Sequence, residues 1–222
     1  MNLEDLIKNS LQELQKIGWE NEIKTQYSKL IFPKYRNNGQ RISEQEARLL
    51  FVRELEKQDK FYYSIETPTK ERYEGFSKKG KKPIVGSGRS GSIDVTLYEK
   101  EGEKCQRKHL IEFKFGNVDT CTKDFLKLLC DDDNCKTNYY INIIKNSDET
   151  TKSNLEDTIA DLEISKYETA IEYIFKYCKD DIKSKLKIFI CILNDIPIAK
   201  NNILEYHINK ENQSIKTITE LI

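Results

Sequence analysis

Three charged residues on two neighbouring predicted strands are the feature of this sequence best suited to chemistry. Glu112 and Lys114 occur as E-F-K, and side chains two residues apart on a strand leave the same face, about 6.6 Å from one another. Asp94 lies in the preceding strand-like segment, S-I-D-V-T, opposite that segment's apolar residues. Antiparallel pairing of the two segments would bring Asp94 next to Glu112.

Two converging carboxylates, with no histidine or thiolate beside them, make a hard oxygen site. Such a site suits Mg²⁺ or Mn²⁺ and not zinc. A divalent ion can polarise a phosphoryl oxygen and lower the pKa of a bound water, while a nearby ammonium orients that water or stabilises developing charge. Asp94, Glu112 and Lys114 therefore predict metal-dependent hydrolysis of phosphodiester bonds, that is, a nuclease.

Hydrophobic periodicity predicts the elements that must position these residues. Predicted helices cover 3–17, 43–57, 119–130 and 153–178, the last as one long helix or two short ones. Predicted strands cover 61–67, 92–98, 108–115, 139–145 and 186–193, with a further edge strand over 203–208. The run 186–193 is apolar and predicts an interior strand. Together these elements predict an α/β (mixed α+β) fold with a central mixed sheet flanked by helices.

The pattern D-x17-E-x-K resembles the motif of the PD-(D/E)XK nuclease superfamily, which has the restriction-endonuclease-like fold. The resemblance implies that Asp94, Glu112 and the backbone carbonyl of Phe113 bind the metal, and that Lys114 contacts the attacking water or the scissile phosphate. Ile93 stands where the family name has proline, a departure that removes no chemical group.

The order of the expected elements agrees with this resemblance. From about 43 to 145 it is helix, strand, strand, strand, helix, strand, which is the αβββαβ order of the family core. The resemblance implies a single nuclease-like domain over 1–222, in which the N-terminal helix 3–17 and residues 146–222 elaborate that core.

In many family members a glutamate from the first core helix completes the site, and this helix offers Glu44 and Glu46. Ser43 and Glu46 have the spacing of a capping box, in which the glutamate serves the helix end. We therefore expect Glu44 to belong to the site, with Glu46 as the alternative.

A basic segment precedes Asp94. Residues 67–89 contain seven lysines and arginines against two glutamates, a local charge of +5, which is enough to hold several phosphates. With its glycines, the stretch between residues 68 and 91 has the composition of a mobile loop. We expect it to lie over the site and to bind nucleic acid through Lys78, Lys79, Lys81, Lys82 and Arg89.

The bulk composition limits the alternatives. Lys and Arg number 37, as do Asp and Glu, so any contact with nucleic acid must come from a local patch. The six cysteines lack the close pairs of a structural zinc site and are expected to be buried small hydrophobes. No signal-peptide pattern occurs, and no stretch has the roughly 20 apolar residues of a membrane span. We expect a cytoplasmic protein.

Three interpretations stay open at this point. The first is an endonuclease that uses Mg²⁺ or Mn²⁺, with DNA favoured over RNA by family analogy alone, a role in restriction or anti-phage defence, and a possible homodimer. The same site would serve equally in repair, recombination or RNA cleavage. The second is a non-catalytic nucleic-acid-binding or interaction module that retains the nuclease fold. The third is purely structural: Asp94, Glu112 and Lys114 form the solvated face of an ordinary sheet, where an ion pair contributes little.

Overall fold

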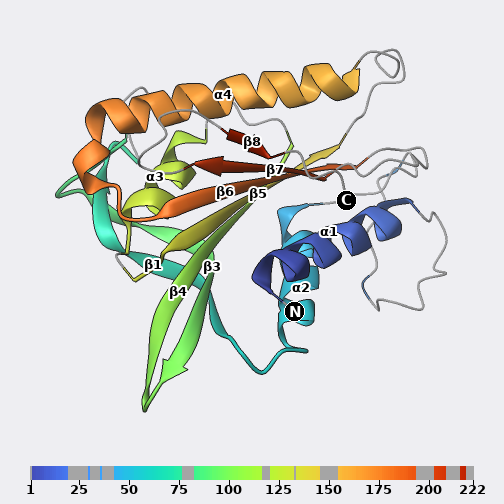
Figure 1. Cartoon of the computed structure of the whole chain (residues 1–222), viewed down its shortest axis with the longest axis horizontal. Coiled ribbons are helices and arrows are strands. Elements are labelled where there is room, and N and C mark those ends of the chain that lie inside the picture. The colour runs from blue at the N-terminus through green and yellow to red at the C-terminus, as the bar shows by residue number, and fades with distance from the viewer. Residues whose placement is uncertain are drawn as a thin grey trace.

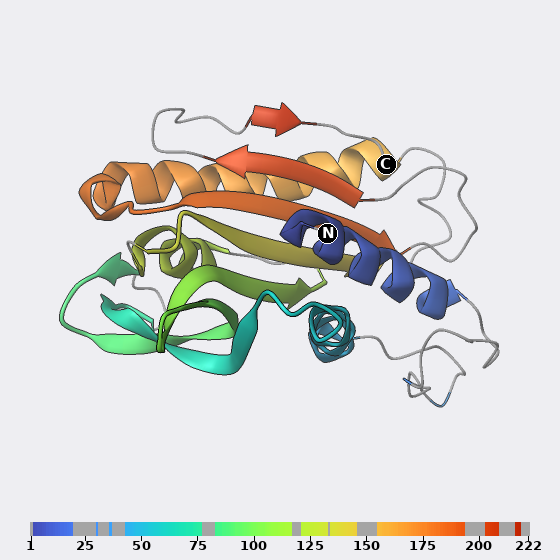
Figure 2. The same cartoon turned by 60° about the horizontal axis from the view of Figure 1, so that its bottom comes forward.

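A single mixed β-sheet forms the centre of the molecule, with helices on both faces (Figure 1, Figure 2). The computed structural model describes residues 2–19, 30, 36, 43–76, 83–116, 121–132, 134–145, 155–193, 203–208 and 216–218. The helices are α1 (Leu3–Trp19), α2 (Glu44–Leu55), α3 (Thr122–Cys130) and α4 (Leu155–Tyr177), with a short 3₁₀ turn over Lys179–Asp181. Among the described residues no helix combines the length and the apolar character needed to cross a bilayer.

The sheet has eight strands in the order β2-β1-β3-β4-β5-β6-β7-β8. Their bounds are β1 (Tyr62–Glu74), β2 (Ile84–Val85), β3 (Arg89–Glu101), β4 (Lys104–Phe115), β5 (Thr137–Lys145), β6 (Lys185–Leu193), β7 (Ile203–Ile208) and β8 (Lys216–Ile218). Strands β4, β5 and β6 run parallel, and the remaining neighbours are antiparallel. The predicted mixed α/β sheet flanked by helices is confirmed at this level.

Each face of the sheet carries its own apolar cluster. Helices α1 and α2 cover one face, where Phe51 packs on Phe113 with ring centroids 5.8 Å apart. Helices α3 and α4 cover the other face, where Phe125 contacts Tyr140 and Tyr167. Because both faces are buried, a charged residue in a central strand has to be neutralised inside the protein.

The structure of the stretch between residues 68 and 91 differs from the sequence prediction. It was expected to be a loop, but β1 continues to Glu74, β2 pairs with it, and β3 begins at Arg89. Tyr73 is fully buried and stacks on Phe76 at 4.7 Å between ring centroids. This burial extends the strand despite the polar composition, and a register shift between Pro68 and Arg72 accommodates the irregular pairing.

The predicted edge position of residues 203–208 is also wrong. These residues form β7, but β8 pairs with its outer side through Glu205 and Ile218. The strand at 186–193 is interior as predicted, since β6 lies between β5 and β7.

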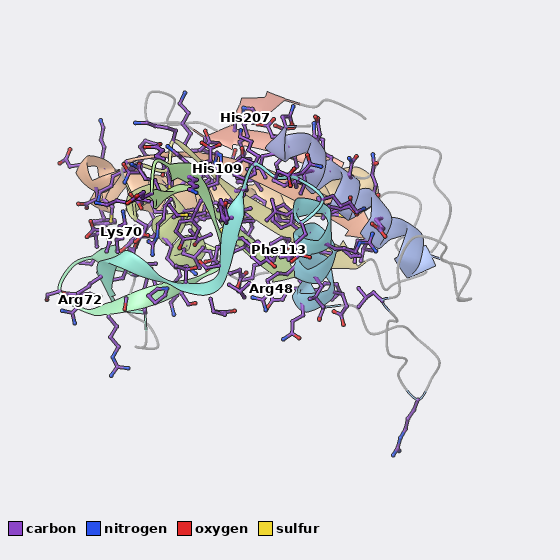
Figure 3. The ribbon with its side chains drawn as sticks, turned by 90° about the horizontal axis from the view of Figure 1, so that it is seen from below. Arg48, Lys70, Arg72, His109, Phe113 and His207 are labelled. Atoms are coloured by element: carbon purple, nitrogen blue, oxygen red, sulfur yellow. The ribbon has the colours of Figure 1, made fainter. Side chains whose placement is uncertain are left out.

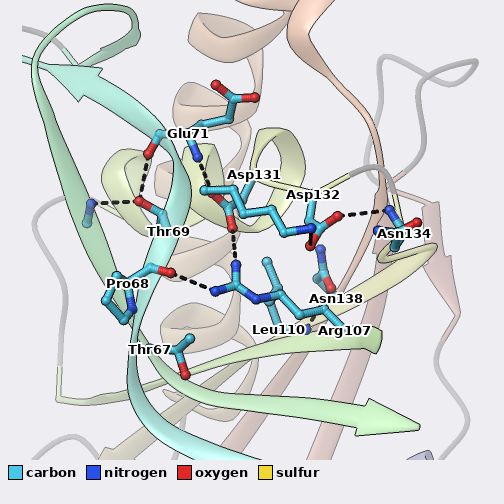
Figure 4. A network of polar contacts seen from close by, with 12 residues as sticks. Thr67, Pro68, Thr69, Glu71, Arg107, Leu110, Asp131, Asp132, Asn134 and Asn138 are labelled. Atoms are coloured by element: carbon cyan, nitrogen blue, oxygen red, sulfur yellow. Dashed lines mark hydrogen bonds and ion pairs between the residues drawn. The ribbon is translucent and has the colours of Figure 1, made fainter. Parts of the chain in front are cut away.

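A buried network of polar contacts joins the end of α3 to β1 and β4 (Figure 4). The carboxylate of Asp131 accepts the amide N–H of Glu71 at 2.9 Å and lies 3.3 Å from the guanidinium of Arg107. Its neighbour Asp132 lies 2.6 Å from the ammonium of Lys70. Burial raises the pKa of Asp131, whereas the Glu71 amide and Arg107 lower it. These contacts fix α3 against the strands that carry the candidate site.

Candidate active site

The carboxylate of Asp94 lies beside the strand that carries Glu112. Antiparallel pairing of β3 and β4 reaches Val95 and Ile111, and one further step would set Asp94 opposite Glu112. The side chain of Asp94 accepts a hydrogen bond from the backbone N–H of Phe113, with 2.7 Å between the Phe113 nitrogen and Oδ2 of Asp94. The predicted antiparallel pairing of the two segments is confirmed, and the Asp94 carboxylate lies against the backbone of Phe113, the residue that follows Glu112.

Glu112 is buried on the face of the sheet that α3 covers. The residue is only 3 % exposed, and Oε1 of its side chain accepts a hydrogen bond of 2.5 Å from Nζ of Lys127. Burial raises the pKa of Glu112 well above its ordinary value; Lys127 opposes this shift, and Asp124 and Asp94 add to it. An acidic group held in this way is typical of functional sites and of internal ion pairs alike.

Lys114 leaves the same face as Glu112, two residues further along β4. Its Nζ lies 3.7 Å from Oδ2 of Asp124, and the side chain remains about one-third exposed. Burial lowers the pKa of Lys114, but the carboxylates around it, Asp124 and Glu44 foremost, raise it more. Lys114 is thus a cation at the solvent side of an acidic cluster.

Glu44, the residue expected to complete the site, lies on the helix that covers this end of β3 and β4. It is the first residue of α2, and burial raises its pKa, with Lys114 lowering it and Asp94 raising it. Glu46 instead closes the capping box, accepting the backbone N–H of Ser43 at 2.8 Å. Glu46 is thus engaged at the helix end, and the assignment of Glu44 to the site stays a prediction.

Three further charged residues surround the cluster and were not singled out from the sequence: Arg48, Asp124 and Lys127. Arg48 lies one helical turn after Glu44, with Nη1 3.5 Å from Oδ1 of Asp94 (Figure 3). Asp124 and Lys127 face each other at 3.1 Å on α3. The sequence signal for them is helical spacing: Arg48 is four residues after Glu44 and Lys127 is three after Asp124, and residues so spaced share a helix face.

Glu66 shows backbone strain directly beside this cluster. It adopts φ of +53°, between the pairs Ile65–Val95 and Thr67–Ile93 that flank the position of Asp94. Its carboxylate accepts hydrogen bonds from Nη1 of Arg48 at 2.8 Å and from Oγ of Ser92 at 2.7 Å. Such strain in a residue other than glycine persists where surrounding contacts require it, and often at functional sites.

The donor set suits a hard divalent cation, although the free protein does not present it ready-made. Among the described residues no three carboxylate, imidazole or thiolate groups already surround one point. Glu112 is instead neutralised by Lys127, and one oxygen of Asp94 is occupied by the Phe113 N–H. Asp94, Glu112 and the Phe113 carbonyl are the oxygen donors that could hold Mg²⁺ or Mn²⁺.

Most of the predicted nucleic-acid-binding residues cannot be placed. Lys78, Lys79, Lys81 and Lys82 lie outside the described residues. Arg89 is described: it is exposed at the start of β3. Two residues later, a Cβ at Gly91 would lie 2.9 Å from the side chain of Lys127, so the strand that begins at Arg89 leads directly to the cluster.

Other candidates in the sequence have structural roles. No disulfide joins any of the described cysteines, and all but Cys105 are buried. His109 is half-buried and bonds through Nδ1 to the carbonyl oxygen of Thr137 at 2.7 Å. The carboxylates of Asp131 and Asp132 are paired with Arg107 and Lys70 and belong to the buried network.

Comparison with known proteins supplies no relative: no family model, curated protein or solved structure matches the chain.

Proposed function

We propose that the protein is a metal-dependent nuclease of the PD-(D/E)XK type that hydrolyses phosphodiester bonds, with DNA as the favoured substrate. The observation that carries the proposal is the position of Asp94, whose carboxylate bonds the amide adjoining Glu112. Arg48 of α2 lies 3.5 Å from Oδ1 of the same carboxylate. Residues drawn from α2, β3 and β4 thus meet at one place.

The order of elements supports the same assignment. From α2 to β5 the chain runs helix, three long strands, helix, strand, with the two-residue β2 inserted after β1. Strands β1, β3 and β4 are antiparallel, and β5 lies parallel to β4. This arrangement agrees with the αβββαβ core that the motif implies.

In the proposed reaction Asp94, Glu112 and the Phe113 carbonyl would hold Mg²⁺ or Mn²⁺, which supplies Lewis-acid activation of a phosphate. Lys114 is about one-third exposed, so its ammonium can meet a water or a phosphate that approaches from solvent. Arg48, beside Asp94, adds a guanidinium suited to a phosphate oxygen. Arg89 and the basic stretch before it would bind the backbone.

The test is cleavage of plasmid DNA, single-stranded DNA and RNA in Mg²⁺ or Mn²⁺, compared with the same reactions in EDTA. Lys114→Ala should lower the rate by about 10²-fold or more, as loss of an electrostatic group at a reacting phosphate does. Lys104→Ala, at an exposed lysine near the start of the same strand, serves as the matched control. Equal products from wild type and Lys114→Ala would contradict the proposal.

One observation favours a second candidate, a non-catalytic module that binds nucleic acid with the same fold. Glu112 is already neutralised by an internal lysine, and an ion pair of this kind can serve structure alone. In that case the protein would bind DNA or RNA equally well with and without divalent ions and would cleave neither.

A further inference from the structure

Lys127 is the one lysine that the fold buries among the described residues, at 7 % exposure. Its Nζ lies 2.5 Å from Oε1 of Glu112, 2.8 Å from the carbonyl oxygen of Ser92 and 3.1 Å from Oδ1 of Asp124. An ammonium has three donors, and three oxygens lie within reach. Lys127 is therefore held as a bound cation would be held, by oxygens from β3, β4 and α3.

The surrounding backbone is shaped around this lysine. Gly91 packs against its stem, where an added Cβ would lie 2.9 Å from the side-chain Cδ. Any other residue at position 91 would push the lysine stem or the strand aside. The aliphatic part of Lys127 thus has a fixed path between α3 and β3, ending at the Glu112 carboxylate.

We propose that Lys127 is an internal competitor for the divalent ion: its ammonium holds Oε1 of Glu112 in the free protein and must give up that oxygen when an ion binds there. The inference rests on the proposed function, because it assumes that Glu112 is a metal ligand. Asp124 is the acceptor that keeps the displaced ammonium neutralised, since it is already in contact with Nζ at 3.1 Å.

The physical reason is the cost of a buried charge. Without any cation, Glu112 would be a carboxylate removed from water with no partner. With two cations on the same oxygen, their mutual repulsion in a low-dielectric site would oppose binding. Lys127 therefore stabilises the metal-free fold and weakens metal affinity by the same contact.

Lys114 provides a matched comparison, because it carries the same charge in the same cluster. Its Nζ lies 3.7 Å from Asp124 and its side chain is more exposed; no ion pair joins it to Glu112 among the described contacts. Removing Lys114 changes the net charge of the site equally and leaves the contact between Lys127 and Glu112 in place.

The experiment is titration of full-length protein with Mn²⁺ alone, followed by calorimetry or by the EPR signal of free Mn²⁺. Lys127→Met should bind Mn²⁺ about tenfold more tightly than wild type, equivalent to one favourable charge contact regained. Lys114→Met should change the affinity by less than about threefold. Equal gains in both variants, or no gain in Lys127→Met, would overturn the competition.

A second readout guards against loss of folding. Lys127→Met and Lys127→Gln leave Glu112 buried without its partner, so both should have a lower melting temperature than wild type in EDTA. Saturating Mn²⁺ should raise the melting temperature of both variants by more than it raises that of wild type. Lys123→Met, an exposed site on α3, should behave as wild type. Tighter Mn²⁺ binding by Lys127→Met without this larger rise in melting temperature would count against the inference.

The outcomes also separate this inference from the proposed function. A wild type that binds Mn²⁺ and cleaves DNA, with Lys127→Met no tighter, would refute the competition and leave the nuclease assignment intact. Absence of Mn²⁺ binding in both wild type and Lys127→Met would refute both.

Discussion

Asp94 has a role in the fold that can be separated from its proposed role in catalysis. Its Oδ2 accepts the Phe113 N–H, and burial raises its pKa. Asp94→Asn retains an oxygen acceptor and removes the charge. We expect the free energy of unfolding to change by less than about 1 kcal/mol while cleavage falls at least about 10²-fold.

Urea denaturation and a plasmid-cleavage assay on the same preparation check this prediction. Glu101→Gln, an exposed carboxylate at the far end of β3, is the control that should retain both properties. Full cleavage by Asp94→Asn would remove Asp94 from the site.

His109 gives a prediction for stability as a function of pH. Its ring contacts Phe61 and Tyr139, with centroids 5.9 and 5.6 Å away, and burial lowers its pKa below 6.5. The unfolded chain therefore takes up the proton first, and the free energy of unfolding should fall as the pH drops below about 6.5. Above that pH the contribution of His109 is fully present.

The measurement is urea denaturation at pH 7.5 and pH 5.5. Thr137, Glu99, Lys60 and Glu4 are the groups that act on the His109 ring. His109→Gln should reduce the loss of stability between the two pH values, whereas Gln45→Ala, at an exposed position, should retain it. An unchanged pH dependence in His109→Gln would show that other groups cause it.

Some residues of the candidate site can be singled out from the sequence pattern, and others cannot. Strand alternation singled out Asp94, Glu112 and Lys114. The alternation does not hold strictly at Asp94, because Ile93 packs in the cluster under α3 and α4 and Val95 in the cluster under α1 and α2. Lys127 and Asp124 could not be singled out, since a charged pair on a helix ordinarily faces solvent. Their burial depends on α3 packing over β4, which is a tertiary property.

At the scale of elements, α2 links the stability of a helix end to the site. Ser43 and Glu46 form its capping box, and Glu44 is the next residue after the cap. Ser43→Ala should lower the free energy of unfolding by about 1 kcal/mol and should also reduce cleavage, because the first turn that carries Glu44 loses its anchor.

Thermal or urea denaturation and the cleavage assay measure both effects. Gln45→Ala, at an exposed position of the same turn, should leave them unchanged. A Ser43→Ala protein with wild-type stability would show that the capping box contributes nothing measurable.

The network around Asp131 connects α3 to β1 and β4 (Figure 4). The Asp131 side chain has no exposed surface, and that of Arg107 is 15 % exposed. Arg107→Met leaves a buried carboxylate without its guanidinium, so we expect a loss of about 2–4 kcal/mol in the free energy of unfolding.

Lys104→Met, at an exposed position of the same strand, is the control and should unfold at the wild-type urea concentration. Chemical denaturation of both variants checks the prediction. Equal stability of Arg107→Met and wild type would mean that the Glu71 amide and the Tyr73 hydroxyl stabilise Asp131 adequately.

Element prediction failed where burial overrode local composition. The stretch before β3 is polar, basic and rich in glycine, yet its first part is a strand because Tyr73 is buried under Phe76. Amphipathic periodicity, by contrast, predicted α2 and α3 to within a few residues, since each buries an apolar stripe.

At the scale of the whole molecule, the sequence predicts a mixed sheet between helices but not the order of its strands. The parallel neighbours β4, β5 and β6 are joined through α3 and α4, as the crossover between parallel strands requires. Strands β7 and β8 extend the same sheet beyond β6. Their pairing depends on long-range contacts that no local pattern encodes.

The position of a divalent ion tests the central claim most directly. Crystals soaked in Mn²⁺ and measured at its absorption edge should show one anomalous peak within about 2.4 Å of a carboxylate oxygen of both Asp94 and Glu112, with the Lys127 ammonium displaced from Glu112. A map with no peak between those carboxylates, and with Lys127 still bonded to Glu112 at saturating Mn²⁺, would contradict the account.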